Sequence, residues 1–217
     1  MRIGVYIDGF NLYYGLFKHG PPVCRQYKWL NPFLLGQEMA TRLKLSGDVT
    51  RVRYFTSRAK HNPEDPGQPT RQQMLVRAME TLPEVSVHWG QHIDTVKRGF
   101  LVGDPDKAIR NFSTREEKGS DVSLGVFMTR DIALKEIDVV LLVSNDSDLV
   151  NAVSVAEADF NTRVYIVSPQ PSGNPSRKLR EAASGLIIVD PDCLAKCQFA
   201  NPVVDGLGRK IHKPDRW

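Results

Sequence analysis

The sequence has few cysteines and no long apolar run, and these two absences exclude whole classes of protein. Three cysteines among 217 residues are too few and too scattered for the disulfide framework of a small secreted domain. Cys193, Cys197 and His212 lack CxxC spacing and a clear fourth ligand, so a structural zinc site is disfavoured. No hydrophobic stretch approaches the roughly 20 residues that a membrane helix needs. The chain also opens on strand-like sequence rather than a signal peptide, and we therefore expect a cytoplasmic protein with no membrane partner.

The chain also lacks an excess of acidic residues. It carries 29 Lys and Arg residues against 25 Asp and Glu residues, for a formal net charge of +4. A basic chain favours an anionic partner, and nucleic acid is the first candidate. Hydrophobic residues make up 41% of the chain, which is typical of a folded globular protein and suits one domain at this length.

Strand-like and helix-like segments alternate along the chain, which predicts an α/β fold. The aliphatic runs VVLLV and VYIV are typical of parallel strands that are covered by helices on both faces. Strands are expected at residues 2–8, 49–56, 85–92, 138–144, 162–167 and 186–189, with a strand or hairpin arm at 95–102. Helices are expected at residues 12–18, 33–45, 70–82, 121–134 and 149–158, and within 177–183. Polar segments at 57–69 and 103–119 are expected to reach into solvent.

Acidic residues occur at the predicted ends of two strands and at the start of a helix. Asp8 ends the first strand, Asp146 and Asp148 follow the strand at 138–144, and Asp121 opens a helix. Ligands of parallel sheets bind outside the carboxyl ends of the strands, so we expect these carboxylates to converge. Carboxylate oxygens are the ligands that Mg²⁺ prefers, and Mn²⁺ accepts them as well. A divalent ion at this edge would suit the cleavage of phosphodiester bonds by an activated water.

Most of these residues also have a purely structural interpretation. Asp8 suits a turn before Gly9, and Asn11, Asp121 and Asp148 suit the start of a helix. Asp146 is harder to explain in this way, because it lies in a tight turn after a buried strand and has no obvious partner in the sequence. The set as a whole therefore favours a metal site.

Three blocks of the sequence resemble the signature blocks of NYN domains, the PIN-like ribonuclease family. They read VYIDGFNLYYG, EEKGSDVSLGVFMTRD and DVVLLVSNDSDLVNAV, and they span roughly residues 1–155. The resemblance implies a Rossmann-like, PIN-like three-layer domain over residues 1–191, followed by a tail or accessory segment at 192–217. It also implies a metal-dependent acidic site and action on RNA. Carried over by position, the acidic site comprises Asp8, Asp121, Asp146 and Asp148, with Asn11 and Ser144 as polar neighbours.

Other residues are candidates for contact with RNA or for a further metal ligand. Basic side chains attract the phosphate backbone, and exposed aromatic rings stack on unpaired bases. Each candidate has an ordinary alternative, either a solvated charge or an aromatic residue of the core. The candidates for RNA are Lys118, the basic run Arg177, Lys178 and Arg180, and the aromatic residues Phe10, Tyr13 and Tyr14. Glu116 and Glu117 are candidates for a further ligand, or for solvated charges.

The sequence therefore predicts a ribonuclease that depends on Mg²⁺ or Mn²⁺ and acts on single-stranded or structured RNA. The four acids would hold the metal, and Ser144 and Asn11 would place the ligands or the water. An RNA-binding or scaffold protein that keeps the acidic pocket without turnover is the first alternative. A phosphatase or other phosphotransferase ranks third, because VYIDGFN lacks the DxD that such enzymes commonly carry after the first strand. The natural RNA and the formation of a homodimer stay open.

Overall fold

The computed structural model describes the chain except for residues 61, 62, 101, 104, 107, 172, 174, 216 and 217. Its main feature is a six-stranded sheet whose strands all run parallel, in the order β3-β2-β1-β6-β7-β8. The strands are β1 (Arg2–Asp8), β2 (Asp48–Thr56), β3 (Val85–Trp89), β6 (Val139–Val143), β7 (Arg163–Ser168) and β8 (Gly185–Ile188). The predicted α/β fold with a mainly parallel sheet is confirmed.

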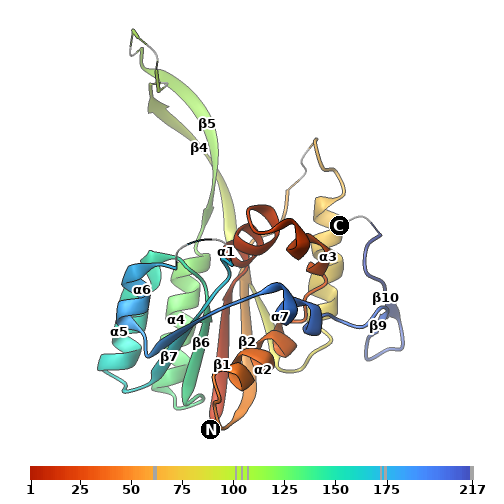
Figure 1. Ribbon diagram of the computed structural model, residues 1–217. Helices are drawn as coiled ribbons and strands as arrows, with labels where there is room; N and C mark the ends of the chain where they lie inside the picture. The colour runs from red at the N-terminus through yellow and green to blue at the C-terminus, as the bar shows by residue number, and fades with distance from the viewer. Residues whose placement is uncertain are drawn as a thin grey trace.

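Helices cover both faces of this sheet and make three layers (Figure 1). Ile3, Val5 and Ile7 of β1 belong to the core on the side of α2, α3 and α7, whereas Tyr6 belongs to the core on the side of α4, α5 and α6. This alternation follows from the period of two along a strand that is buried on both faces. The helices are α1 (Gly9–Leu12), α2 (Pro32–Arg42), α3 (Gln68–Met79), α4 (Ser120–Ala133), α5 (Val150–Ala158), α6 (Arg177–Ala182) and α7 (Pro191–Lys196), with shorter turns η1 (Tyr13–Lys18), η2 (Pro22–Tyr27) and η3 (Ser147–Leu149). Among the described residues, no helix combines the length and the apolar character required to cross a membrane.

The first helical segment differs from its prediction. The sequence predicted one helix over residues 12–18, whereas the chain forms the short helix α1 and then the π-helical turn η1. Asp8 caps α1, so the helix begins directly after the strand ends. Gly9 permits this turn, because a Cβ at this position would lie 2.7 Å from the main-chain oxygen of Phe55. The aromatic residues that follow Asp8 are thereby held at the carboxyl edge of the sheet.

A long antiparallel ribbon projects from the sheet, formed by β4 (Gln91–Gly99) and β5 (Arg110–Lys118) (Figure 1). The predicted hairpin arm is confirmed, although residues 101, 104 and 107 of the predicted arm and polar passage lie outside the described residues. The strand predicted to reach residue 92 stops at Trp89, because the chain leaves the sheet there to pair with β5. At the base of the ribbon, Gly119 adopts a φ of 94°, a left-handed conformation that favours glycine, and α4 begins.

The segment after residue 191 packs against the domain. Helix α7 buries Cys193 and Leu194 in the same core as α2 and α3, and Ile211 of the small hairpin β9 (Val203–Val204) and β10 (Lys210–Ile211) joins them. Trp29 is fully buried there, and its Nε1 donates a hydrogen bond of 3.1 Å to the oxygen of Ala200. The segment therefore covers one edge of the helical layer that contains α2.

Candidate metal centre

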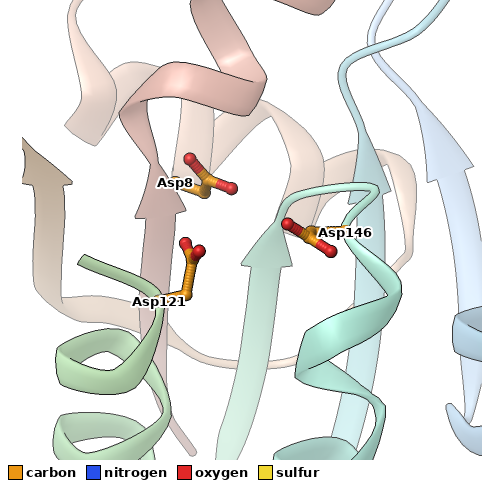
Figure 2. Close-up of side chains that lie close together, drawn as sticks. All are labelled: Asp8, Asp121 and Asp146. Carbon is orange, nitrogen blue, oxygen red and sulfur yellow. The ribbon is translucent and has the colours of Figure 1, made fainter. Parts of the chain in front are cut away.

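Three carboxylates converge at the carboxyl edge of the sheet. Asp8, Asp121 and Asp146 each offer one oxygen, and these oxygens all lie within 4.8 Å of one another. Figure 2 shows Asp8 at the end of β1, Asp121 at the start of α4 and Asp146 in the loop after β6, with the three carboxylates directed toward one space. The convergence follows from the sheet order, because β1 and β6 are neighbours and Ile7 pairs with Val143.

Asp8 is held firmly in this cluster. Its Oδ1 accepts a hydrogen bond of 2.9 Å from the main-chain nitrogen of Asn11, and its Oδ2 accepts one of 3.1 Å from Oγ of Ser144. The side chain is only 4% exposed. Each carboxylate oxygen can accept more than one bond, so both keep a lone pair for another ligand.

Ser144 and Asn11 connect the two strand ends. Ser144 is fully buried, donates to Asp8 and accepts a 3.1 Å hydrogen bond from the main-chain nitrogen of Asp146. Asn11 uses its Oδ1 to accept a 2.9 Å bond from the main-chain nitrogen of Asn145. Both residues, which the sequence suggested as polar neighbours of the acids, thus position the loop that carries Asp146.

Asn145 extends this network to the next layer, a connection that the sequence did not suggest. Its Nδ2 donates a 2.8 Å bond to Oε1 of Gln170, and its Oδ1 accepts a 2.5 Å bond from the nitrogen of Ser176. Ser176 caps α6, so the basic helix is attached to the strand end that carries Asp146. The signal in the sequence was only an asparagine between two predicted site residues.

Asp148 lies outside the cluster of three. It is exposed, and its main-chain nitrogen donates a 2.9 Å bond to Oδ1 of Asp146, which caps the turn η3. Glu117 lies closer to the cluster than its neighbour Glu116. It accepts a 2.8 Å bond from Oγ of Ser120, and its charge contributes to the raised pKa of Asp121. Glu116 pairs instead with Lys97 and Lys118 on the ribbon.

The remaining residues that the sequence suggested lie around the centre rather than within it. Lys118 is exposed at the end of β5, where its Nζ lies 2.8 Å from Oε2 of Glu116. Tyr13 is half-buried, while Tyr14 is 40% exposed and stacks on His19 with ring centroids 5.7 Å apart. The basic residues of α6 are all exposed: Arg177, Lys178 and Arg180. Arg177 forms an ion pair of 2.7 Å with Glu181.

The electrostatics of the cluster favour a bound cation. Burial raises the pKa of Asp8 to about 6, and the charges of Asp121 and Asp146 add to the effect. Burial also raises the pKa of Asp121, followed by repulsion from Asp146. Among the described residues, no Lys or Arg forms an ion pair with any of these three acids. Oxygen ligands that repel one another and lack a cationic partner fit a hard divalent ion such as Mg²⁺ or Mn²⁺.

Comparison with known proteins agrees with this architecture. The family model of the NYN domain matches residues 2–190. A curated relative, 6-hydroxy-3-succinoylpyridine 3-monooxygenase HspA of Pseudomonas putida (strain DSM 28022 / S16), is 28% identical over an alignment of 250 positions, which covers 100% of this chain and 75% of the relative. A solved structure of a protein of unknown function, VPA0982 from Vibrio parahaemolyticus RIMD 2210633, shares the fold with a TM-score of 0.51 and 17% identity, over 88% of this chain and 94% of that one. The match to the family model over most of the chain shows that this protein belongs to the NYN domain family.

Proposed function

We propose that the protein is a metal-dependent ribonuclease whose divalent ion is held by Asp8, Asp121 and Asp146. The observation that carries the proposal is the convergence of three carboxylates at the carboxyl edge of an NYN domain. When bound there, Mg²⁺ or Mn²⁺ lowers the pKa of a water and offsets the negative charge of the phosphate. RNA, single-stranded or structured, is the proposed substrate because the family is nuclease-like and the chain is basic.

The role of the surrounding residues is to fix the ligand oxygens before any ion or substrate arrives. Ser144 orients Oδ2 of Asp8, and the main-chain nitrogens of Asn11 and Asp148 orient one oxygen each of Asp8 and Asp146. Hydrogen bonds of this kind lock the rotamers of a site and support the affinity for metal. Asn11 also ties the Asp146 loop to α1.

A groove of about 840 Å³ lies beside the centre and would give a polymer access to it. It runs between α4 and the start of α5, and its walls include Asp121 and Asp148, with Lys118 at the end of β5. Asp121 therefore belongs both to the cluster and to the wall of an open groove. A phosphodiester that lies along this groove would come next to the ligand oxygens.

A substitution of Asp148, which lines this groove, tests whether it is a metal ligand like the three clustered acids. Asp148→Asn should lower the rate of RNA cleavage by less than about tenfold, because its carboxylate is exposed and only its main chain supports Asp146. The measurement is single-turnover cleavage of a mixed single-stranded RNA pool in Mn²⁺, with EDTA as the blank. A loss as large as that of Asp146→Asn would place Asp148 among the metal ligands.

The basic helix α6 provides a test of RNA binding that does not depend on turnover. Replacement of Arg177, Lys178 and Arg180 by alanine should flatten the slope of log affinity against log salt concentration by about 2 units, since each phosphate contact to a single strand contributes about 0.7. The affinity for a single-stranded RNA is measured in EDTA between low and moderate salt. An unchanged slope would mean that these side chains are only a solvated face of α6. Tight binding without cleavage in Mn²⁺ would favour the alternative of an RNA-binding protein without turnover.

The name of the Pseudomonas putida relative suggests a second candidate function. That relative is named as a monooxygenase of 6-hydroxy-3-succinoylpyridine, and it aligns with the whole of this chain. A pocket beside α1, whose wall includes the rings of Phe10, Tyr13, Tyr14 and Tyr54, would also accept a small ring as a ligand of this chain. Oxygen uptake that depends on 6-hydroxy-3-succinoylpyridine and a reduced nicotinamide donor would support this second function, and its absence would leave RNA cleavage as the activity to test.

A further inference from the structure

A pocket of about 490 Å³ lies beside α1, on the β2 side of β1. Helices α1 and α3, the turn η1, the end of β2 and the base of the ribbon all contribute to its wall. Gly9, which follows Asp8 directly, lines the pocket, whereas none of the three clustered acids does. A volume of this size is within the range of about 300–1,000 Å³ that is typical of sites for small ligands.

Aromatic side chains form a large part of the pocket wall. Tyr13 is the central one: its ring meets Tyr14 edge-on at 5.6 Å and Phe17 at 6.3 Å between ring centroids. Phe10 and Tyr54 add two further rings from α1 and β2. Aromatic rings in offset or edge-to-face arrangements attract another planar ring beyond the simple burial of its area. This wall therefore favours a flat, unsaturated ligand.

The charges that line the pocket are mainly positive. Lys28, Lys60, Arg71 and Arg115 contribute cations, against the single carboxylate of Asp65. Lys60 and Arg115 both pair with Asp94 on the ribbon, at 3.8 and 2.5 Å, and Arg71 pairs with Asp65. Within the part of the chain that the structure describes, no carboxylate forms an ion pair with Lys28, the remaining cation.

Lys28 is placed where an anion would be favoured. Its Nζ lies 5.8 Å from the centroid of the Tyr13 ring, and the residue is half-buried. Burial lowers the pKa of Lys28, and the nearby positive charges of Arg71 and Arg25 lower it further, while the negative charge of Asp65 opposes them. An anion between Lys28 and Arg71 would relieve this repulsion and restore part of the lost solvation. The structure thus combines an aromatic wall with a lysine that contacts the Tyr13 ring and forms no ion pair with any carboxylate of the described residues.

Residues 57–59, which follow β2 in the wall of the pocket, are fixed by hydrogen bonds. Gln72 of α3 accepts a 2.6 Å bond from the nitrogen of Ala59 and donates a 2.9 Å bond to the oxygen of Ser57. Oγ of Ser57 lies 3.0 Å from Nε2 of His92 at the base of the ribbon. This part of the wall is therefore organised before a ligand binds, which lowers the cost of ordering on binding.

We propose that this pocket binds a small molecule in which an anionic group is linked, directly or through a sugar, to a planar aromatic ring, with the ring against Tyr13 and the anion next to Lys28 and Arg71. A free aromatic carboxylate and a single nucleotide share this chemistry. The proposal requires neither a bound metal ion nor RNA cleavage, so its failure would leave the proposed ribonuclease function untouched.

Calorimetric titration of the full chain in EDTA tests the proposal with four probes. Pyridine-3-carboxylate and uridine 5′-monophosphate carry both features, pyridine-3-carboxamide lacks the anion, and cyclohexanecarboxylate lacks the aromatic ring. At least one of the first two should bind at least about tenfold more tightly than both of the last two, which corresponds to about 1.4 kcal/mol. Preference for the carboxylate would identify a small acid as the ligand, and preference for the nucleotide would identify a unit of nucleic acid.

Three single-residue variants test whether the preferred probe binds in this pocket. Lys28→Met should weaken binding of the preferred probe by at least about tenfold, the usual scale for the loss of a charge-assisted contact. Lys135→Met, at an exposed lysine after α4, is the matched control and should leave binding unchanged. Tyr13→Leu should also weaken binding, with a thermal melt to confirm folding. No binding of either ring-bearing anion at millimolar concentration, equal binding of the uncharged amide, or full affinity in Lys28→Met would each overturn the proposal.

Discussion

Replacement of Asp146 by asparagine should lower the rate of RNA cleavage by at least about a hundredfold, the scale expected when metal-assisted activation of water is lost. Asparagine keeps the size of the side chain and the oxygen that accepts from the nitrogen of Asp148, so the turn η3 should persist. What is lost is one of three carboxylates that face a common space (Figure 2). The measurement is single-turnover cleavage of single-stranded RNA in Mn²⁺, with circular dichroism to confirm an unchanged fold.

The matched control for this experiment is Asp159→Asn. Asp159 is an exposed carboxylate at the C-terminal end of α5, the end of the helix away from η3, and its main-chain nitrogen bonds to the oxygen of Val155. The control should cleave RNA at the wild-type rate. Wild-type activity in Asp146→Asn would remove that residue from the mechanism, and equal losses in both variants would mean that the loss is not specific to the acidic cluster.

The second large effect concerns Asp8 in the metal-free protein. Asp8→Asn should be more stable than the wild type at pH 8 in EDTA, by about 2 kcal/mol, because the wild type must bury an ionised carboxylate near two others. For a chain of this size the difference corresponds to a rise of about 4 to 8 °C in melting temperature. Asparagine retains the oxygen that accepts from the nitrogen of Asn11.

The pH dependence gives the sign of this effect a separate test. The pKa of Asp8 is about 6 in the folded protein, against about 3.9 for an unfolded aspartate. The folded state therefore binds more protons between these values, and the free energy of unfolding of the wild type should fall as pH rises from about 4 to about 6. Below pH 4 both states are protonated, so the advantage of Asp8→Asn should disappear. Thermal melts of the wild type and of Asp8→Asn at pH 3.5, 6 and 8 in EDTA measure this difference in stability.

Addition of the ion should reverse the order of the two proteins. An ion at 100 times its dissociation constant adds about 2.7 kcal/mol to the wild type, and Asp8→Asn should gain much less because it lacks one ligand. The same melts at pH 8 in excess Mn²⁺ test this. If the wild type gains nothing from Mn²⁺, or if Asp8→Asn is the less stable protein in EDTA, the acids are not a crowded cation site.

The layers of the fold could be predicted from the sequence because the strands carry unbroken aliphatic runs. VVLLV of β6 is buried throughout, and such a strand has to lie inside a parallel sheet with helices on both faces. The strand order could not be predicted from the sequence in the same way. That β1 lies between β2 and β6 follows from long-range pairing, and only this order brings Asp8 next to the loop of Asp146.

The sequence predicted both Asp146 and Asp148 as metal ligands, although only Asp148 also suited the start of a helix. The structure distinguishes them through the turn η3, in which Asp146 turns its side chain toward the cluster, whereas Asp148 donates its main-chain nitrogen to Asp146 and keeps its own carboxylate outside the cluster. The sequence also could not decide whether Glu116 or Glu117 is the better candidate for a further ligand. The register of β5 against β4 decides between them, since adjacent residues of a strand point to opposite faces.

The aromatic pocket could not be predicted from any local pattern. Tyr13 and Tyr14 appeared either as core residues or as stacking platforms for bases, and the π-helical turn η1 gives them a third place, in the wall of a pocket. Lys28 carried no signal at all in the sequence. Its position depends on how the turn η2 packs against η1 and against α7, which is far away in the sequence.

An anomalous difference map from crystals that contain Mn²⁺ would test the central claim most directly. The account predicts a peak at ligand distance from the carboxylate oxygens of Asp8, Asp121 and Asp146, in the space that they share (Figure 2). Water molecules are expected to complete the coordination, as is usual for small divalent ions. A map without a peak among these three oxygens, recorded at a Mn²⁺ concentration that raises the melting temperature of the protein, would contradict it.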